Sequence, residues 1–326
     1  MSDSAVLLQV RDLRKHFRLK GGSVVRAVDG VSFDLKNGET LSIVGESGCG
    51  KSTVARLVMR LYEPTGGSVF FEGENLLDLG RAEIRARRRE MQLIFQDPYA
   101  SLDTRKTAGY AIREPLIIHG IGDKASRAER MYHLIETVGL DRDAARRYPH
   151  EFSGGQRQRI GIARAIAPGP KLVLADEPVS ALDVSIQSQT LNLLVRLRQE
   201  FRFSYIFISH DLAVVKHISD RVAVMYLGRF VELADVDALF SNPLHPYTIS
   251  LISAIPQPRM GERPGRIILE GDVPDPSSPP PGCPFHPRCS KAMPVCSEIA
   301  PAEVDVGSPG SPHLISCHLF SPAPSV

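Results

Sequence analysis

The stretch GESGCGKST (Gly45–Thr53) limits what this chain can fold into more than any other part of the sequence. The apolar run LSIV before it predicts a buried strand, and VARLVMRLY after it has the periodicity of a helix. A glycine-rich turn of the form G-x-x-x-x-G-K-[ST] between strand and helix predicts a phosphate-binding loop, in which backbone N–H groups contact phosphates. We expect Lys51 to contact the terminal phosphates of a nucleotide and Ser52 to bind Mg²⁺. Because an ordinary strand–helix turn can also match the pattern, a second motif is needed.

That second motif is VLADEP (Val173–Pro178). The apolar run ends at Asp176, which places this carboxylate at the carboxyl end of a strand, where open α/β sheets bind ligands. Asp176 can hold Mg²⁺ there through water. Phosphoryl transfer to water also needs a group that orients or deprotonates the water, and Glu177 fits this role. The alternative, a solvated strand end with two acids, is disfavoured by the phosphate-binding loop that precedes it.

The third motif is FSGGQRQR (Phe152–Arg159). Ser153 is suited to cap a helix whose first turn contains Gly154 and Gly155. Two glycines at a helix start leave the backbone amides uncovered, which suits the close approach of an anion.

Composition excludes several classes of protein. The 39 basic and 37 acidic residues give a net charge of +2, which makes no case for nucleic-acid binding. The basic run RAEIRARRRE (Arg81–Glu90) predicts the solvated face of a short helix. No apolar run reaches the roughly 18 residues of a membrane-spanning helix, and the N-terminus lacks a signal-peptide layout. We therefore expect a cytosolic protein that reaches a membrane only through partners.

Strand and helix patterns alternate along the chain. The apolar runs Lys171–Asp176, Ser204–Ser209 and Arg221–Gly228 alternate with helical patterns, which predicts a parallel sheet with crossover helices. Residues 98–168 are helical in pattern and predict an insertion into that sheet. The opening segment has three strand-like runs joined by turn signals, which predict an antiparallel layer.

With these three motifs, the chain resembles the ATP-binding cassette (ABC) ATPase subunits of membrane transporters, from about Leu7 to Ala254. The resemblance implies an α/β fold of the P-loop NTPase type. It would contain a RecA-like, mostly parallel sheet, an antiparallel β subdomain, a helical subdomain at about 98–168, and a loop-rich C-terminal extension. The implied domains are a nucleotide-binding domain at 1–254 and the extension at 255–326.

The resemblance also implies roles for single residues. The implied catalytic residues are Lys51, Gln96, Glu177 and His210. Phe17 would stack on adenine. The other implied ATP-binding residues are Gly45, Ser47, Gly48, Cys49, Gly50, Lys51, Ser52, Thr53, Gln96, Ser153, Gly154, Gly155, Gln156, Asp176 and Asp183. The implied Mg²⁺ ligands are Ser52, Gln96 and Asp176. Cys49 itself is expected to be a small filler rather than a reactive thiol.

The resemblance identifies Gly45–Thr53 as the Walker A loop, Leu172–Glu177 as Walker B and Phe152–Gln156 as the signature motif. In this family each ATP lies between the Walker motifs of one cassette and the signature motif of another. Ser153 to Gln156 would therefore serve the nucleotide of a partner cassette. The γ-phosphate would hold the two surfaces together until hydrolysis releases them.

Two further stretches narrow the resemblance to importers. Ser241–Pro258 resembles the C-terminal segment of oligopeptide/dipeptide (and nickel) importer ATPases, and Glu63–Arg105 is most similar to the second of their two paralogues. The resemblance implies a paralogous ATPase as partner, two transmembrane permease subunits and an extracytoplasmic solute-binding protein. The protein would lie peripherally at the cytoplasmic face of the inner membrane, with Asp97–Arg105 near a permease helix.

The tail contains four cysteines, Cys283, Cys289, Cys296 and Cys317. The tail is rich in proline and has no apolar run that could form a core, so a metal centre held by four thiolates would give it order. Four cysteines can bind zinc or an iron–sulfur cluster. Family members with a similar set imply a [4Fe–4S] cluster, with Zn²⁺ or free or disulfide-bonded cysteines as alternatives. Nearby histidines leave a mixed-ligand site open: His286, His313 and His318.

Two rival functions remain. A soluble ABC-type ATPase acting in translation or DNA repair would usually join two cassettes or carry a long coiled coil, and this chain shows neither. A catalytically silent regulatory cassette is disfavoured because Lys51, Glu177 and His210 are all present.

Overall fold

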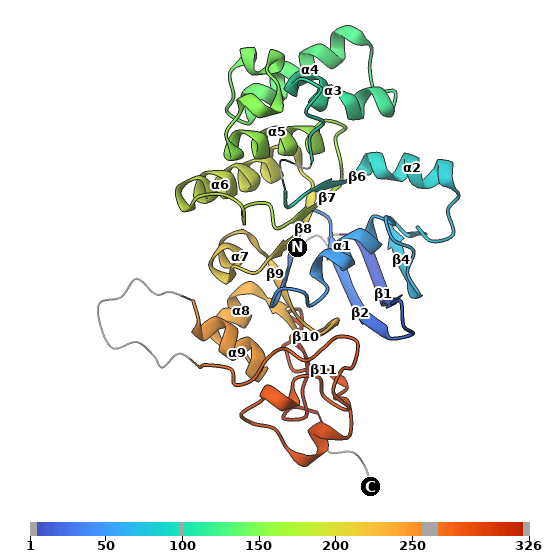
Figure 1. The fold of residues 1–326 in the computed structure, drawn as a ribbon, viewed down its shortest axis with the longest axis vertical. Coiled ribbons are helices and arrows are strands. Elements are labelled where there is room, and N and C mark those ends of the chain that lie inside the picture. Colours follow the sequence, from blue (N-terminus) through green and yellow to red (C-terminus); the bar gives the residue numbers. More distant parts are fainter. Residues whose placement is uncertain (1–4, 98, 100, 256–266, 322–326) are drawn as a thin grey trace, which may run out of the picture. The chain divides into compact units, whose positions relative to one another are not determined.

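The computed structural model describes residues 5–97, 99, 101–255 and 267–321, and the chain divides into two compact units. The first unit comprises Met1–Leu8, Leu35–Thr40 and Phe71–Ile208. The second unit comprises Gln9–Asp34, Leu41–Phe70 and Ser209–Val326. Each unit is therefore built from segments that lie far apart in the sequence, as the colours of Figure 1 show.

Three parallel strands form the centre of the first unit. Their order is β8 (Ser204–Ser209), β7 (Leu172–Asp176) and β6 (Met91–Ile94). The register pairs Leu172 with Met91 on one side and with Ser204 on the other. Every residue of β7 and β8 is buried, as expected for parallel strands that are covered on both faces. The predicted parallel arrangement is confirmed for these strands.

Helices fill the chain between β6 and β7. They are α3 (Ala108–Ile118), α4 (Lys124–Thr137) and α5 (Gly154–Ile166), with 3₁₀ turns at Arg142–Arg146 and Pro149–Glu151. Each of the three helices begins with a side-chain cap, because Thr107, Asp123 and Ser153 accept hydrogen bonds from backbone N–H groups. Figure 1 shows these helices together, with α3 in contact with α4 and α5. Helix α6 (Val184–Phe201) follows β7.

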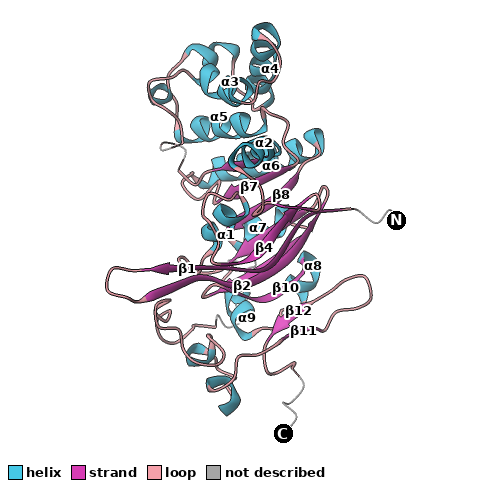
Figure 2. Cartoon of the chain, turned by 90° about the vertical axis from the view of Figure 1, so that its right-hand side faces the viewer, coloured by secondary structure: helices cyan, strands magenta, loops and turns pink. Residues whose placement is uncertain are grey.

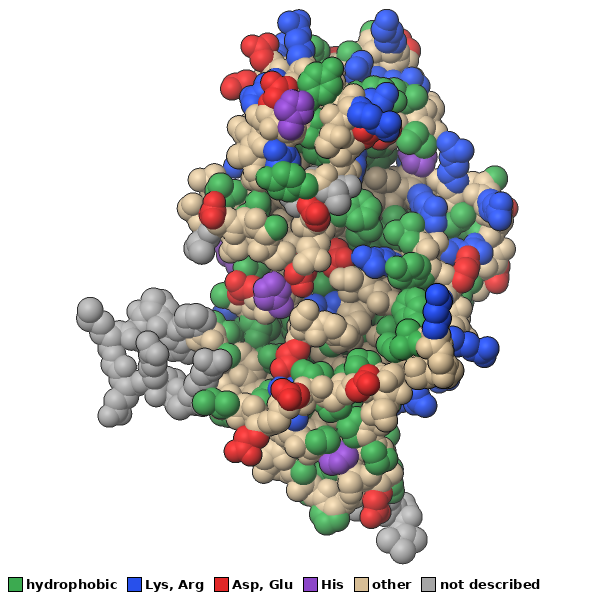
Figure 3. Space-filling view, in the orientation of Figure 1, with side chains coloured by type: hydrophobic (Ala, Val, Ile, Leu, Met, Phe, Trp, Pro, Cys, Tyr) green, Lys and Arg blue, Asp and Glu red, His purple; other side chains and the backbone are tan. Residues whose placement is uncertain are grey.

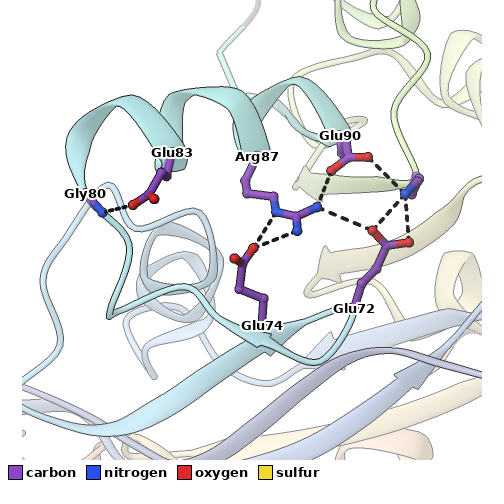
Figure 4. Close-up of polar contacts among 7 residues, drawn as sticks. Glu72, Glu74, Gly80, Glu83, Arg87 and Glu90 are labelled. Atoms are coloured by element: carbon purple, nitrogen blue, oxygen red, sulfur yellow. Dashed lines mark hydrogen bonds and ion pairs between the residues drawn. The ribbon is translucent and has the colours of Figure 1, made fainter.

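Charged side chains fix α2 (Arg81–Glu90) to its neighbours in the first unit (Figure 4). Arg87 pairs with Glu74 and Glu90 at 2.6 and 2.9 Å. Lys171, just before β7, lies 2.9 Å from the same Glu90. These pairs are partly exposed, so each contributes about 0–1 kcal/mol. The remaining face of α2 meets solvent, as predicted, and Figure 3 shows basic side chains there; the exposed arginines are Arg81, Arg85 and Arg89.

Two long strands open the chain, and most of their residues belong to the second unit. β1 (Val6–Arg18) and β2 (Val24–Lys36) each have 13 residues, and they form a sheet in the order β2-β1-β4 with β4 (Gly66–Phe71). The two-residue β5 (Glu74–Asn75) follows β4 in the chain. Figure 2 shows β1 and β2 as long neighbouring ribbons.

Other strands of this unit are neighbours in the order β11-β12-β10-β9-β3, which is part of a longer sheet. β3 (Thr40–Val44) and β9 (Arg221–Tyr226) are parallel, whereas β10 (Arg229–Asp235) is antiparallel to both β9 and β12. The tail supplies β11 (Glu303–Asp305) and β12 (Leu314–Ser316), seen beside β10 in Figure 2. The helices of this unit are α1 (Lys51–Val58), α7 (Leu212–Ile218), α8 (Val236–Ser241) and α9 (Pro246–Ser253).

The C-terminal tail shares the core of the second unit, which corrects the expectation that it has no core. Phe285 is 1% exposed and packs edge-to-face on Tyr226, with ring centroids 5.2 Å apart. Cys283 and Cys296 belong to the same buried cluster. Packing against this core therefore gives the tail order of its own. The sequence hid this because the tail contributes single apolar residues rather than a run.

A buried carboxylate anchors the end of the tail to β10. The side chain of Glu232 is fully buried and lies 2.7 Å from Nε2 of His313, two residues before Ile315 in β12. The backbone N–H groups of Leu244 and His245 also donate to it, each at 2.9 Å. Burial alone would raise the pKa of Glu232, but these hydrogen bonds hold the pKa below its ordinary value.

Candidate functional site

The glycine-rich loop joins β3 to α1 in the second unit. Its glycines are required by close backbone contacts as well as by conformation. A Cβ on Gly45 (φ 152°) would lie 2.2 Å from the carbonyl oxygen of Met225, and one on Gly50 (φ 109°) would lie 2.0 Å from that of Ala27. Gly50 is also the left-handed residue that precedes the first turn of α1. The loop therefore brings uncovered backbone to the start of a helix, as an anion site needs.

Lys51 is buried against this loop. Its Nζ donates to the carbonyl oxygens of Gly45 and Glu46, each at 2.9 Å, and lies 3.8 Å from Sγ of Cys49. Burial raises the pKa of the Cys49 thiol, which agrees with its expected role as a filler rather than a nucleophile. Ser52 and Thr53 are half-buried, whereas Ser47 and Gly48 are exposed.

In the first unit, Gln96 and Glu177 are brought together. Nε2 of Gln96 donates to Oε2 of Glu177 at 2.9 Å. Asp176 is buried at the end of β7, and Glu177 directly follows it with a φ of 46°. This left-handed conformation costs a non-glycine residue about 1–3 kcal/mol, and such strain is concentrated at functional sites. The N–H of Glu177 donates to the carbonyl of Ile208 at 3.0 Å, which helps to hold the strained turn.

The signature stretch begins α5. Oγ of Ser153 accepts a hydrogen bond from the N–H of Gln156 at 3.3 Å, and the side chain of Gln156 accepts one from the N–H of Ser153 at 3.1 Å. This reciprocal capping box confirms Ser153 as the helix N-cap.

The two glycines of this stretch have different surroundings, and they should therefore differ in tolerance to a methyl group. A Cβ on Gly155 would lie 2.6 Å from Cγ2 of Ile186, while one on Gly154 would be 3.8 Å from its nearest neighbour, Leu182. We expect Gly155→Ala to lower the free energy of unfolding by about 1–3 kcal/mol through overpacking. The matched Gly154→Ala should be neutral or stabilise by up to about 1 kcal/mol, since alanine favours a helix. Urea unfolding of both variants measures this, and equal losses would contradict it.

The remaining predicted site residues are Phe17, Asp183 and His210. Phe17 is half-buried near the end of β1, with its ring centroid 5.7 Å from that of Tyr62. Nε2 of the neighbouring His16 lies 2.9 Å from Oδ1 of Asp29. Successive side chains of a strand point to opposite faces, so only one of the two rings can stack on a base, and His16 is already paired. Asp183, before α6, and His210, after β8, are both exposed.

The four tail cysteines lie near one another in the second unit. Burial raises the pKa of the Cys283 thiol to about 11, and the other three thiols act on it electrostatically in the same direction. Within residues 5–97, 99, 101–255 and 267–321, however, no three His, Cys, Asp or Glu side chains are grouped so that they could hold a metal ion. The predicted iron–sulfur ligand set, Cys283, Cys289, Cys296 and Cys317, is thus not assembled in this structure.

The nearby histidines contact other groups. Nδ1 of His286 lies 2.9 Å from the carbonyl oxygen of Cys283, and Nε2 of His318 lies 2.8 Å from that of Ile299. His313 pairs with Glu232. A mixed-ligand site is therefore not assembled either.

Sequence reasoning missed a contact between the segment after Gln96 and α5. The guanidinium carbon of Arg157 lies 3.8 Å from the centroid of the Tyr99 ring, and its Nε donates to the carbonyl of Pro149 at 2.5 Å. A cation–π contact of this kind is worth about 0.5–2 kcal/mol. No spacing rule could have revealed it, because the partners are linked only by the fold. Of the segment Asp97–Arg105, residues 98 and 100 lie outside the described residues.

Comparison with known proteins places these features in a family. The ABC transporter model matches residues 28–180, and the model "Oligopeptide/dipeptide transporter, C-terminal region" matches residues 231–296. The chain is 50% identical to the oligopeptide transport ATP-binding protein AppF of Bacillus subtilis, over 98% of this chain and 99% of that protein. It is 48% identical to the dipeptide transport ATP-binding protein DppF of Escherichia coli, over 95% and 93% of the two chains.

Solved structures agree with this placement. A dimeric post-hydrolysis structure of the ATP-binding cassette MJ0796, bound to ADP and Pi, matches with a TM-score of 0.65 and 29% identity, over 71% of this chain and 99% of that chain.

Among the described helices, none combines the length and hydropathy needed to cross a membrane. The chain therefore belongs to the ABC transporter family, as an ATP-binding subunit of its oligopeptide/dipeptide group.

Proposed function

We propose that this chain hydrolyses ATP to power the uptake of oligopeptides or dipeptides across the cytoplasmic membrane. The observation that carries the proposal is the similarity to AppF and DppF, which extends over nearly the whole chain and includes the C-terminal region. The nucleotide-binding domain is assigned to 1–254 and the importer extension to 255–326, of which 256–266 and 322–326 lie outside the described residues.

We assign nucleotide binding to the residues that the sequence predicts for it. Lys51 and the loop amides bind the phosphates, Phe17 stacks on adenine, and His210 contacts the γ-phosphate region. Ser52, Gln96 and Asp176 offer oxygen ligands of the kind that Mg²⁺ prefers. They would hold the ion, which would supply positive charge against the phosphates. Glu177 orients and deprotonates the attacking water. The hydrogen bond that Glu177 accepts from the amide of Gln96 supports this role, because it orients the carboxylate.

A second cassette completes each nucleotide site. The partner is a paralogous ATPase, and its nucleotide is bound by Ser153, Gly154, Gly155 and Gln156. Asp183 is assigned to ATP binding. The support is the dimeric state described for MJ0796 and the family's use of two paralogues.

Two permease subunits and an extracytoplasmic solute-binding protein complete the transporter, and the chain lies peripherally at the cytoplasmic face of the inner membrane. Two exposed aromatic side chains beside the Gln96 segment support a permease contact here: Phe95 is 44% and Tyr99 61% exposed. Aromatic residues are enriched at interfaces relative to the rest of the protein surface.

Reconstitution into lipid vesicles tests the function. The chain would be combined with candidate paralogous ATPase, permease and binding proteins, and ATP turnover measured with di- and oligopeptides. We expect a transported peptide to raise ATP turnover and to accumulate inside the vesicle. Association with ribosomes or DNA instead of permeases, with no response to any peptide, would refute it.

The four tail cysteines are assigned to a metal centre, with a [4Fe–4S] cluster first and Zn²⁺ second. The mutual electrostatic influence of the thiols supports this, although their side chains would have to turn toward a common centre and lose their protons. We expect protein purified without oxygen to contain about four iron and four sulfide per chain, and to lose them in a Cys289→Ser variant. A colourless, iron-free preparation would contradict the cluster.

A further inference from the structure

A residue of the C-terminal tail contacts the glycine-rich loop and holds it in place. Glu46, the second residue of the loop, forms a two-pronged ion pair with Arg288. Nη1 of Arg288 donates to Oε2 of Glu46 at 2.7 Å, and Nη2 donates to Oε1 at 3.1 Å. The Arg288 side chain is only 7% exposed and that of Glu46 is 29% exposed. Paired, shielded charges of this geometry are stronger than ordinary surface ion pairs.

A second contact holds the backbone of Glu46. Its N–H donates to the hydroxyl of Tyr247, at the start of α9, at 2.9 Å. Tyr247 is fully buried and packs against Phe285, with ring centroids 5.3 Å apart. Phe285 lies three residues before Arg288, so one short tail segment fixes both the aromatic cluster and the guanidinium. All of these residues belong to the second unit.

The ion pair has an electrostatic consequence for a phosphate ligand. Glu46 puts a carboxylate into a loop whose amides and Lys51 would otherwise present only positive charge. Unpaired, this carboxylate would repel a triphosphate and compete for the Lys51 ammonium, whose Nζ already contacts the Glu46 carbonyl. Arg288 neutralises it and draws it toward the tail.

We propose that Arg288 is a positioning residue of the ATP site, which keeps the Glu46 carboxylate neutralised and holds the loop Gly45–Thr53 in the conformation that accepts phosphate. The inference rests on the proposed function, since it requires that this loop binds ATP. It assigns the tail a direct part in nucleotide binding.

A charge-cycle experiment tests it. The Mg²⁺ complex of a non-hydrolysable ATP analogue would be titrated against wild type, Arg288→Met, Glu46→Gln and the double variant. We expect Arg288→Met to weaken binding about tenfold, the scale of a lost charged hydrogen bond. Glu46→Gln should have a smaller effect. The double variant should bind like Glu46→Gln, because the uncompensated carboxylate is gone.

Controls separate positioning from general damage. Lys291→Met removes a charge from an exposed tail residue three positions away and should leave affinity unchanged. Arg288→Lys, which keeps the charge but not the fork, should fall between wild type and Arg288→Met. In steady-state hydrolysis the loss should appear in KM with little change in kcat.

The outcomes are distinct. If the double variant binds as weakly as Arg288→Met, the tail acts only as structural support and the proposal is wrong. If wild type and Arg288→Met bind the analogue equally, the proposal fails while the proposed function stands. If wild type binds no analogue at all, the proposed function and this inference fall together.

Discussion

Replacing Glu177 by glutamine should lower the rate of ATP hydrolysis by 10²- to 10⁴-fold, the range for loss of a general base. Glutamine preserves the size of the side chain and an oxygen that can accept the hydrogen bond from Gln96. Like glutamate, it is a non-glycine residue, so the free-energy cost of the left-handed φ of 46° is unchanged. ATP binding should therefore persist while turnover falls by this factor. Slow turnover with retained nucleotide, measured by phosphate release and by equilibrium binding, is the expected pattern.

The matched control is Glu129→Gln. Glu129 lies on α4 and is exposed, so the same chemical change there should leave turnover at the parent rate. A Glu177→Gln protein that hydrolyses ATP as fast as its parent would remove Glu177 from the role of base. A variant that also fails to bind ATP would show that Glu177 shapes the site rather than acting on water.

Replacing Lys51 by methionine should weaken ATP binding by about 10- to 150-fold. A hydrogen bond to a charged group contributes about 1.5–3 kcal/mol, and each 1.4 kcal/mol is tenfold in Kd. Methionine nearly matches the volume of the buried lysine stem, so packing around α1 should be retained. Titration of the chain with the Mg²⁺ complex of a non-hydrolysable ATP analogue measures the change.

Lys20→Met provides the comparison for this second variant. Lys20 is exposed in the turn between β1 and β2, so its replacement changes net charge equally without touching the loop. Equal affinities for wild type and Lys51→Met would undermine the assignment of the glycine-rich loop to phosphate.

Local sequence signals predicted much of the fold. They also predicted the glycine-rich loop and, separately, the motif that contains Asp176 and Glu177. The run Lys171–Asp176 predicted β7 because Leu172–Ala175 are continuously apolar, and the strand is buried throughout. Ser153 followed from capping chemistry alone. The helix after the glycine-rich loop ends at Val58, earlier than its periodicity indicated, because Arg60 adopts a left-handed φ of 48°.

Features that depend on distant partners could not be predicted. β10, β11 and β12 had no strong pattern of their own, since their identity as strands comes from pairing with one another and with β9. The pair Glu46–Arg288 joins residues 242 positions apart. The cysteine spacing suggested a metal but could not show that Cys283 and Cys296 are also core residues. No periodicity marks contacts of this range.

The tail's place in the second unit also bears on how the protein is made. Leu41–Phe70 leaves the ribosome early, but its packing partners Tyr226, Tyr247 and Phe285 are synthesised much later. At synthesis rates of about 5–20 residues per second, on the order of ten seconds or more pass before these partners are available to the loop region. A chain that stops before Phe285 would leave the aromatic cluster open to solvent, a surface that chaperones bind, so this unit cannot become native until the segment that contains Phe285 has been made.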